Sequence, residues 1–323
     1  MTTINAGAGP STTSRGLRPS LQPPVSLRSS RPRRAEKLAY ALLVAAAGVS
    51  ILTTVGIVLS LVLPAIQFFR EVSIVEFLTG TSWTPRFSDQ AYGVLPLITG
   101  TLWTTAIALA VSIPIGLGAA IYLSEYAAPR TRTVFKPVLE LLAGVPSVVY
   151  GLFAVAFVGP VVLNGWLGIE VQTFSVLAAG LVLGVMIIPT VASLAEDAMS
   201  AVPRALREAS YGLGANRMRT VLLVVFPAAI SCIAASIVLG LSRAVGETMI
   251  VAMAAGSQAK MVTDPLEGGQ TMTGFIASAA LGDSVQGSLQ YNTLFAVGLT
   301  LFVITLVINL ISIRLVNRFR EVY

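Results

Sequence analysis

Long apolar runs separated by short charged segments dominate this chain. Runs with few or no charges cover 38–69, 94–124, 141–169, 171–195, 220–256 and 284–313. A helix of about 20 predominantly apolar residues is long enough to cross the hydrocarbon core of a bilayer. The pattern therefore predicts an all-α integral membrane protein with six spanning helices. Several of the runs contain prolines, which are tolerated in a bilayer where neighbouring groups satisfy the freed backbone; this favours a transport bundle over a passive anchor.

Composition supports the membrane assignment and divides the chain unequally. Hydrophobic residues make up 55% and charged residues 11% of the 323 residues, and the mean hydropathy is +0.82. Soluble domains carry about 25% charged residues, so a water-soluble globule is excluded. Residues 1–36 are rich in Ser, Thr, Pro, Gly and Arg and lack apolar periodicity, which predicts a disordered basic cytoplasmic tail. Residues 37–323 are predicted to form a single transmembrane domain with its core at 94–314.

Basic residues fall mainly on one side of the expected membrane. If both termini are cytoplasmic, the 21 Lys and Arg residues are all on that side except Arg70, Arg86, Arg243 and Lys260. Positive residues concentrate in cytoplasmic loops, so both termini are predicted to be cytoplasmic. The membrane is predicted to be the plasma (cell inner) membrane. The same anchors account for the pI of about 9.8 without nucleic acid as a partner.

Residues that carry chemistry are scarce. The chain has no His, and its single Cys232 lies within an apolar run, so neither a transition-metal site nor an intrachain disulfide is expected. No nucleophile–base constellation of an intramembrane enzyme is found. The phosphate-binding pattern G-x-x-x-x-G-K-[ST] is absent as well, so we expect no cofactor on this chain.

The segment between the fourth and fifth runs, 196–227, has the pattern of a helix–turn–helix. Pro203 suits the start of a helix, the sequence RALREAS continues it as an amphipathic helix, and Gly212 and Gly214 end it. A second helix is expected from about Ala215 into the membrane.

The same segment resembles the coupling loop of ABC-importer permeases. Glu208-Ala209-Ser210, then Gly214, then Val224-x-Phe226-Pro227 keep the spacing of that motif, with Ser, Val and Phe as mild departures. The stretches YGVLPLITGTLWTT (92–105), LELLAGVPSVVYGLF (139–153) and SRAVGETMIVAMAAG (242–256) are similar to phosphate-specific permeases. TGTSWTP (79–85) favours the PstC-type subunit, and a PstA-type subunit is the alternative.

The resemblance implies a six-helix type I ABC importer permease and a set of partners. The partners are a PstA-type permease, two PstB-type ATPase subunits that bind ATP and Mg, and an extracytoplasmic PstS-type phosphate-binding protein. The short helix of the loop would dock on the ATPase, which assigns coupling roles to Glu208, Ala209, Ser210, Gly214 and Pro227. This chain would then form the path for phosphate and hydrolyse nothing itself.

Two charges interrupt the fifth apolar run. The run Ala228–Gly256 is expected to form one continuous helix, so Arg243 and Glu247, four residues apart, would share a face near its middle. A charge at the centre of a membrane helix costs about 2.5–3.5 kcal/mol on insertion scales and marks a functional candidate. The pair either forms a structural salt bridge or lines the substrate path. The phosphate-permease family carries the same pair.

Weaker candidates accompany the pair. Thr248, Ser242 and the expected break at 144–147 offer donors to an anion, and Glu140 is a charge at the start of the third run. Ordinary helix packing explains the small hydroxyl residues equally well. In the segment 70–93, Trp83 and Tyr92 are expected at the membrane interface, where aromatic residues collect.

Alternatives remain for the transported substrate and for the energy source. The coupling motif does not distinguish phosphate from molybdate or sulfate. An ion-coupled secondary transporter would use the same buried charges, but its inverted repeats are not evident in the sequence.

Overall fold

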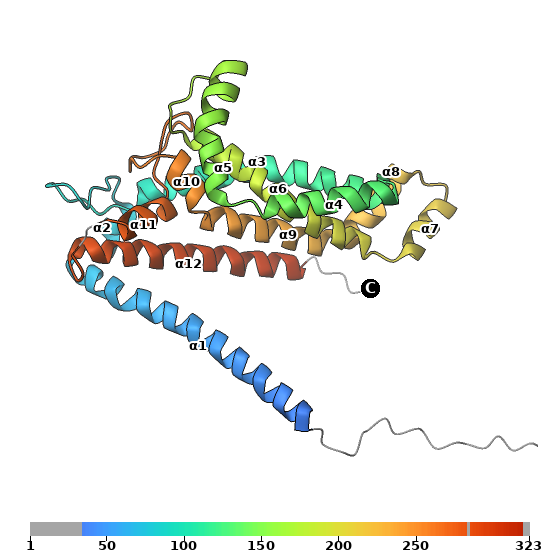
Figure 1. Ribbon diagram of the computed structural model, residues 1–323, viewed down its shortest axis with the longest axis horizontal. Coiled ribbons are helices and arrows are strands. Elements are labelled where there is room, and N and C mark those ends of the chain that lie inside the picture. Colours follow the sequence, from blue (N-terminus) through green and yellow to red (C-terminus); the bar gives the residue numbers. More distant parts are fainter. Residues whose placement is uncertain (1–33, 283–284, 319–323) are drawn as a thin grey trace, which may run out of the picture. The chain divides into compact units, whose positions relative to one another are not determined.

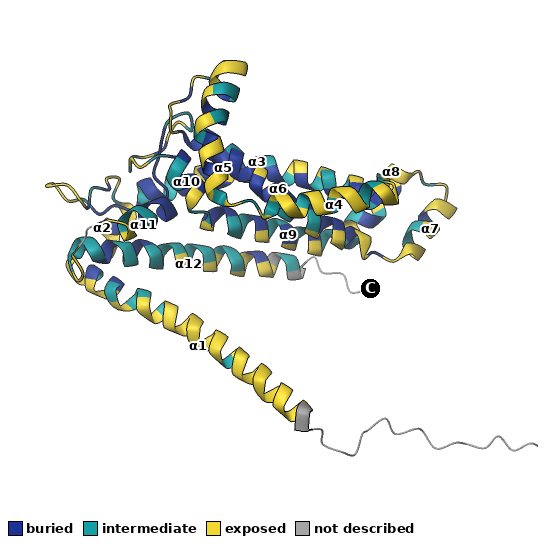
Figure 2. Cartoon of the chain, in the orientation of Figure 1, coloured by how far each residue is buried: buried dark blue, intermediate teal, exposed yellow. Residues whose placement is uncertain are grey.

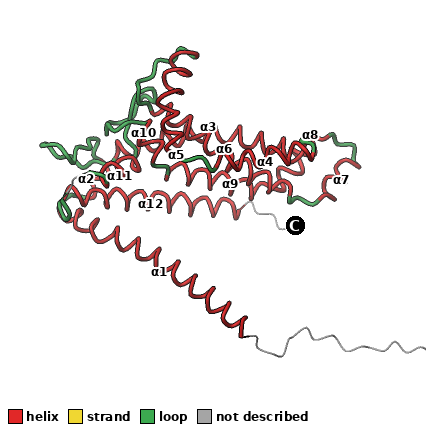
Figure 3. Tube along the Cα trace, viewed as in Figure 1, coloured by secondary structure: helices red, strands yellow, loops and turns green. Residues whose placement is uncertain are grey.

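The computed structural model describes residues 34–282 and 285–318, and this part of the chain is almost entirely helical (Figures 1 and 3). The predicted disordered tail, 1–36, lies outside the described residues except for its last three, which begin the first helix. The elements, with η for π-helical segments, are α1 (Arg34–Glu71), α2 (Ile74–Thr79), α3 (Leu95–Ile121), η1 (Tyr122–Tyr126), α4 (Pro129–Ala143), α5 (Ser147–Phe153), η2 (Ala154–Trp166), α6 (Val176–Ser200), α7 (Arg204–Gly212), α8 (Arg217–Thr220), η3 (Val221–Val225), α9 (Phe226–Gly246), α10 (Met249–Ala254), α11 (Met272–Ala280) and α12 (Leu289–Arg318).

Six helices in the described part are long and apolar enough to cross a membrane. They cover Glu36–Glu71, Leu95–Tyr126, Ser147–Trp166, Val176–Ser200, Arg217–Gly246 and Leu289–Arg314. This confirms the six spans expected from the apolar runs. The chain separates into two compact units, residues 1–56 and 57–323, so α1 begins in the first and ends in the second. The first unit contributes only the start of α1 to the described structure, and all that follows concerns the second.

Helices α3 and α6 form the centre of the second unit. They pack along each other, α9 packs on α6, and α12 packs on α9. Figure 2 shows the buried residues concentrated on α6 and its neighbours. Two glycines on α6 make the close approach possible, because a Cβ on Gly180 would lie 2.8 Å from Ile107 Cβ and one on Gly184 would lie 2.9 Å from the Ala108 carbonyl oxygen. Small residues one turn apart allow membrane helices to approach in this way.

The third span begins later than the sequence predicted. Residues 129–143 form the separate amphipathic helix α4. The helix is interrupted at 144–146, and α5 starts at Ser147. The break was expected, but the assignment of Glu140 to the start of the third span was wrong, because Glu140 lies exposed on α4. Pro146 explains the boundary, since the residue before a proline is driven out of the helical region.

The expected continuous helix 228–256 is also interrupted. Helix α9 ends at Gly246, Glu247 has extended backbone angles (φ −65°, ψ 133°), and α10 starts at Met249. The prediction of one continuous helix was therefore wrong. The interruption puts Arg243 in the last turn of α9, so the expectation that it lies mid-helix was wrong as well.

An aromatic cluster closes the end of the unit where α2 and α11 lie. Trp83 packs edge-on against Phe77 and Phe275, and Phe68 packs edge-on against Phe77 and Tyr92. Trp83 and Tyr92 are only 3% and 6% exposed. The expectation that their rings settle at the lipid interface was therefore wrong, because both are buried within the protein.

Candidate functional site

Arg243 extends from the last turn of α9 toward α6. It is half-buried, and its Nη1 donates to Thr190 Oγ1 at 2.9 Å. Thr190 directly follows Pro189 inside α6. Within the described residues, Arg243 forms no ion pair, so its neutral hydroxyl partner leaves the charge uncompensated. A cation in the last turn of a helix is stabilised by the helix dipole. This stabilisation offsets part of the free-energy cost of placing the Arg243 charge within the membrane.

Glu247 occupies the break and faces the following helix. Its Oε1 accepts from the backbone N–H of Met249 at 3.0 Å and of Ile250 at 3.3 Å. The carboxylate therefore caps the N-terminus of α10, where helix geometry leaves N–H groups without partners and the dipole favours negative charge. The two charges that the sequence placed together are held separately, each at the helix end that stabilises its sign.

A hydroxyl from a distant segment holds the break open. Thr273 Oγ1, in the first turn of α11, donates to the backbone carbonyl of Glu247 at 2.6 Å. This replaces a bond that the carbonyl would have accepted within a continuous helix. Thr248 lies in the gap with its hydroxyl 3.3 Å from the Gly246 carbonyl. Arg243, Glu247 and Thr248 thus border one interruption, built by α9, α10 and α11.

The structure places the two remaining substrate-path candidates elsewhere. Ser242 points to α12, where its hydroxyl donates to Asn309 Oδ1 at 2.7 Å, whereas Arg243 points to α6. Glu140 lies on α4, which is not one of the three helices, α9, α10 and α11, that form the interruption. Neither residue is brought together with Arg243.

The 196–227 loop forms the expected helix–turn–helix. Helix α7 runs Arg204–Gly212 after Pro203, and Gly214, with φ +80°, reverses the chain before α8. Ser210 is buried and hydrogen-bonds Thr220 across the turn at 2.9 Å between the two hydroxyl oxygens. Ser210 therefore faces the turn between α7 and α8, and its predicted role in coupling to the ATPase stays a prediction. Glu208 and Ala209 are exposed, and Pro227 lies in the first turn of α9.

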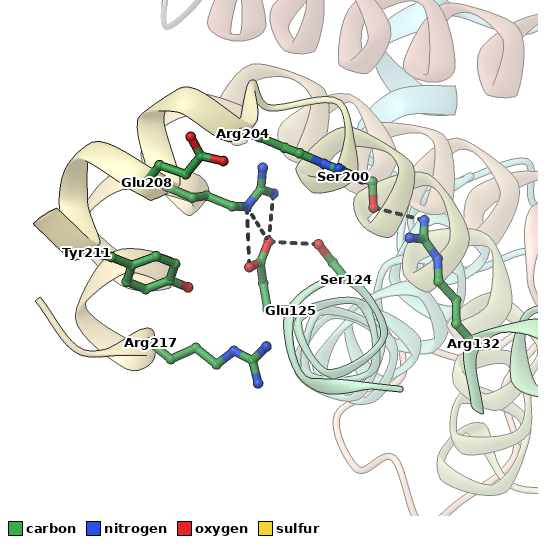
Figure 4. Close-up of a pocket in the computed structure, with 9 residues that line it drawn as sticks. Ser124, Glu125, Arg132, Ser200, Arg204, Glu208, Tyr211 and Arg217 are labelled. Carbon is green, nitrogen blue, oxygen red and sulfur yellow. Dashed lines mark hydrogen bonds and ion pairs between the residues drawn. The ribbon is translucent and has the colours of Figure 1, made fainter. Parts of the chain in front are cut away.

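A pocket of about 370 Å³ opens beside α7 (Figure 4). Its lining is rich in arginine and comprises Ser124, Glu125, Arg132, Ser200, Arg204, Arg207, Glu208, Tyr211 and Arg217. Glu125 lies in its middle, where Ser124 donates to the carboxylate at 3.1 Å. Arg217 lies over the ring of Tyr126, 5.3 Å from its centroid, which is a cation–π contact.

A second charged group ties α4 to α6. Glu196 is 1% exposed and accepts from Arg132 and from Lys136, whose Nζ also donates to Asp197 at 2.6 Å. Hydrogen bonds to Asp197 and then to Glu196 raise the pKa of Lys136 above its usual 10.5. Buried carboxylates require partners of this kind.

Sequence reasoning missed several of these residues. Thr190 and Thr273 look like ordinary hydroxyl residues in apolar runs, although Pro189 marks the place in α6 where backbone bonding is interrupted. Glu125 and Glu196 flank apolar runs and resemble solvated loop charges. Arg207 directly precedes the coupling motif, and that adjacency was the available signal.

Comparison with solved structures places the fold among ABC importers. The chain is similar to a bacterial ABC transporter involved in import of the acidic polysaccharide alginate, with a TM-score of 0.64 and 17% identity over 89% of this chain and 97% of the other. A chain of the MetNI methionine ABC transporter gives a TM-score of 0.51 and 20% identity over 71% of this chain and 95% of the other. At such identities the likeness establishes the fold alone, the six-helix importer permease fold that the sequence predicted.

Sequence relatives extend over most of the chain. The probable ABC transporter permease protein YqgH of Bacillus subtilis is 37% identical over 86% of this chain and 89% of its own length. The phosphate transport system permease protein PstC 1 of Mycobacterium tuberculosis is 36% identical over 76% and 82%, and the PstC protein of Xylella fastidiosa is 30% identical over 88% and 91%.

The family assignment follows from the sequence itself. Residues 112–321 match the family described as "Binding-protein-dependent transport system inner membrane component". That range contains α6, α7 and the α9–α10 break. The chain belongs to this family and is a multi-pass membrane permease component of an ABC transport system.

Proposed function

We propose that this chain is the PstC-type permease subunit of an ATP-driven importer of inorganic phosphate. The observation that carries the substrate is Arg243, whose guanidinium is held by the neutral Thr190 at 2.9 Å and faces no carboxylate partner within the described residues. A guanidinium stays charged at all physiological pH values and matches phosphate oxygens with a planar pair of donors. The PstC names of relatives in Mycobacterium tuberculosis and Xylella fastidiosa agree with this substrate.

Glu247 has two tasks in this proposal. Its Oε1 caps α10 and so maintains the break beside Arg243. Its carboxylate also accepts a hydrogen bond from a protonated phosphate oxygen, which fully ionised sulfate does not offer. Thr248, in the same gap, adds a hydroxyl. A single bound anion is thus held by one cation and selected by one acceptor, and it remains able to leave.

Movement of the path is driven by partners in this proposal. Two PstB-type ATPases, separate chains that bind ATP and Mg, dock on the exposed face of α7 that carries Glu208 and Ala209. The PstA-type permease completes the bundle. The PstS-type binding protein docks at the opposite end, where the segments 83–87 and 257–259 line a pocket of about 510 Å³. ATP-driven closure of the ATPases moves α7 and switches the bundle between inward- and outward-facing states.

The proposed orientation puts both termini and α7 in the cytoplasm. The predominance of basic residues at that side supports it. With Cys232 replaced by serine, Leu213→Cys and Leu281→Cys, at positions 90% and 89% exposed, test it by labelling with a membrane-impermeant maleimide in intact cells. Labelling is expected at position 281 before lysis and at position 213 only after lysis, and the reverse pattern would invert the topology.

Uptake of labelled phosphate tests the substrate and the site together. Cells lacking this gene receive the wild type, Arg243→Gln, Glu247→Gln or the control Arg130→Gln, which alters an exposed arginine on α4. We expect the wild type and the control to restore uptake that excess sulfate and molybdate do not reduce, and the two site variants to reach the membrane but fail. Normal transport by both site variants would show that the two charges are structural. Uptake blocked by molybdate or sulfate would assign another oxyanion.

A further inference from the structure

Arg207 joins three elements through one side chain. Its Nη2 and Nε donate to the Glu125 carboxylate in η1, at 2.7 and 3.2 Å to Oε1. Its Nη2 also donates to the Met199 carbonyl at 2.8 Å, and its Nη1 donates to the Val202 carbonyl at 2.6 Å. Arg207 lies on α7, Glu125 extends α3, and Met199 lies in the last turn of α6. The short helix α7 is therefore tied to the ends of both central helices.

These bonds are shielded from solvent. The Arg207 side chain is 16% exposed and the Glu125 side chain is 5% exposed. A buried arginine–carboxylate pair with directed hydrogen bonds has one favoured geometry, because the planar fork fixes orientation as well as distance. Arg204, on the same helix, is exposed and forms no ion pair in the described structure. Arg207 is thus bonded to the bundle, whereas Arg204 lines the same pocket without an ion-pair partner in the described residues.

Helix α6 connects the hydrogen bonds of Arg207 to the α9–α10 break. Thr190, which holds Arg243, precedes Met199 by nine residues on the same helix, a separation of roughly 14 Å along a helix axis at 1.5 Å per residue. Since Gly180 and Gly184 allow α6 to lie closely against α3, a displacement of α7 applied to both helix ends moves them together. The contacts from α7 to Arg243 are physically continuous.

We propose that Arg207 is a positioning residue that transmits the ATPase-driven displacement of α7 to α3 and α6, and through Thr190 to Arg243. Glu125 is its counterpart in the bundle. This inference rests on the proposed function for its account of what moves α7 and what is transported. It assigns a mechanical role to a residue on the inward face of α7, distinct from the exposed residues that would contact the ATPase.

The test uses the complete importer reconstituted in liposomes, with ATP hydrolysis and labelled phosphate uptake measured on the same vesicles. Arg207→Gln and Glu125→Gln are expected to keep ATP hydrolysis while phosphate moved per ATP falls about tenfold or more, the scale set by losing a charged hydrogen bond from a buried site. Because the two residues act as one unit, the double variant should be no worse than either single variant. Arg207→Lys should recover part of the ratio, and the control Arg130→Gln, which alters an exposed arginine on α4, should leave it unchanged.

Contrary results would overturn the inference. It fails if Arg207→Gln assembles fully with an unchanged ratio, or if Arg130→Gln lowers the ratio equally, which would indicate a general effect of losing a positive charge on the cytoplasmic side. If Arg207→Gln does not assemble, the near-isosteric Glu125→Gln decides in its place.

A second measurement separates this inference from the proposed substrate. If the wild type moves no phosphate, the proposed function fails. A dye on Leu281→Cys then reports the conformational change; this residue directly follows α11, which lies at the end of the unit opposite α7 (Figure 1). Its ATP- and vanadate-dependent signal should persist in Arg130→Gln and vanish in Glu125→Gln. A signal retained in Glu125→Gln would refute transmission through the pair.

Discussion

Replacing Gly184 by alanine tests how closely the two central helices are packed. The added Cβ would lie 2.9 Å from the carbonyl oxygen of Ala108 and 2.9 Å from Val111 Cβ. Ordinary contacts to a Cβ begin near 3.4 Å, and the Ala108 oxygen belongs to a helix backbone that cannot yield alone. Helices α3 and α6 must therefore separate by several tenths of an ångström along their shared face.

The size of the effect follows from overpacking. Inserting a methyl group into a close-packed interface costs about 1–3 kcal/mol. The matched control is Gly118→Ala, on α3, where no atom lies within 4 Å of the new Cβ and the change gains up to about 1 kcal/mol of helix propensity. Since both changes gain the same helix propensity, the two variants should differ by the overpacking cost of about 1–3 kcal/mol, which is roughly fivefold to 150-fold in the folding equilibrium.

Unfolding in mixed micelles with a rising fraction of SDS, followed by circular dichroism, measures this difference. We expect the Gly184→Ala midpoint to shift to less SDS than the wild type and the Gly118→Ala midpoint to stay or rise. Equal midpoints for the two variants would refute the argument, because they would show that the α3–α6 contact yields without cost.

Three further changes address single contacts. Thr190→Val removes the acceptor that orients Arg243, so phosphate uptake at unchanged membrane levels should fall roughly 5–30-fold; full uptake would show that this orientation is dispensable. Gly214→Ala puts a side chain at φ +80° and should destabilise the detergent-solubilised protein by about 1 kcal/mol, whereas Gly212→Ala should not, as thermal unfolding of both will show. The raised pKa of Lys136 means that its stabilising contribution is complete below pH 10.5 and is lost as pH rises through the folded-state pKa. Lys136→Met should therefore flatten the fall of thermal stability above that pH, and an unaltered alkaline limb would contradict the assignment.

The number and order of the spanning helices could be predicted because apolar length is a local property of the sequence. The ends of the helices depend on contacts that are not local. The break after Gly246 requires Thr273, 26 residues further along the chain, to bond the Glu247 carbonyl. Nothing in the run 228–256 itself forbids a continuous helix, so its pattern predicted one.

In the candidate site, too, the features that depend on local sequence were predictable and those that depend on contacts between distant segments were not. Arg243 was identified because a lone charge in an apolar run is rare, and the coupling segment was identified because its motif is contiguous. The partners of these residues were not predictable in this way. Arg207 meets Glu125 across 82 residues of sequence, and each charge by itself looks like a membrane anchor next to an apolar run.

The aromatic cluster has a consequence for the order of assembly during synthesis. Phe77 and Trp83 leave the ribosome early, but Phe275, which packs on Trp83, follows roughly 200 residues later, about 10–40 s at typical translation rates. Until then the segment beyond α1 has large rings without their final neighbour. A chaperone or insertase that covers exposed aromatic surface would act in that interval. Truncated chains that stop before α11 should consequently be degraded faster than chains that stop just after it.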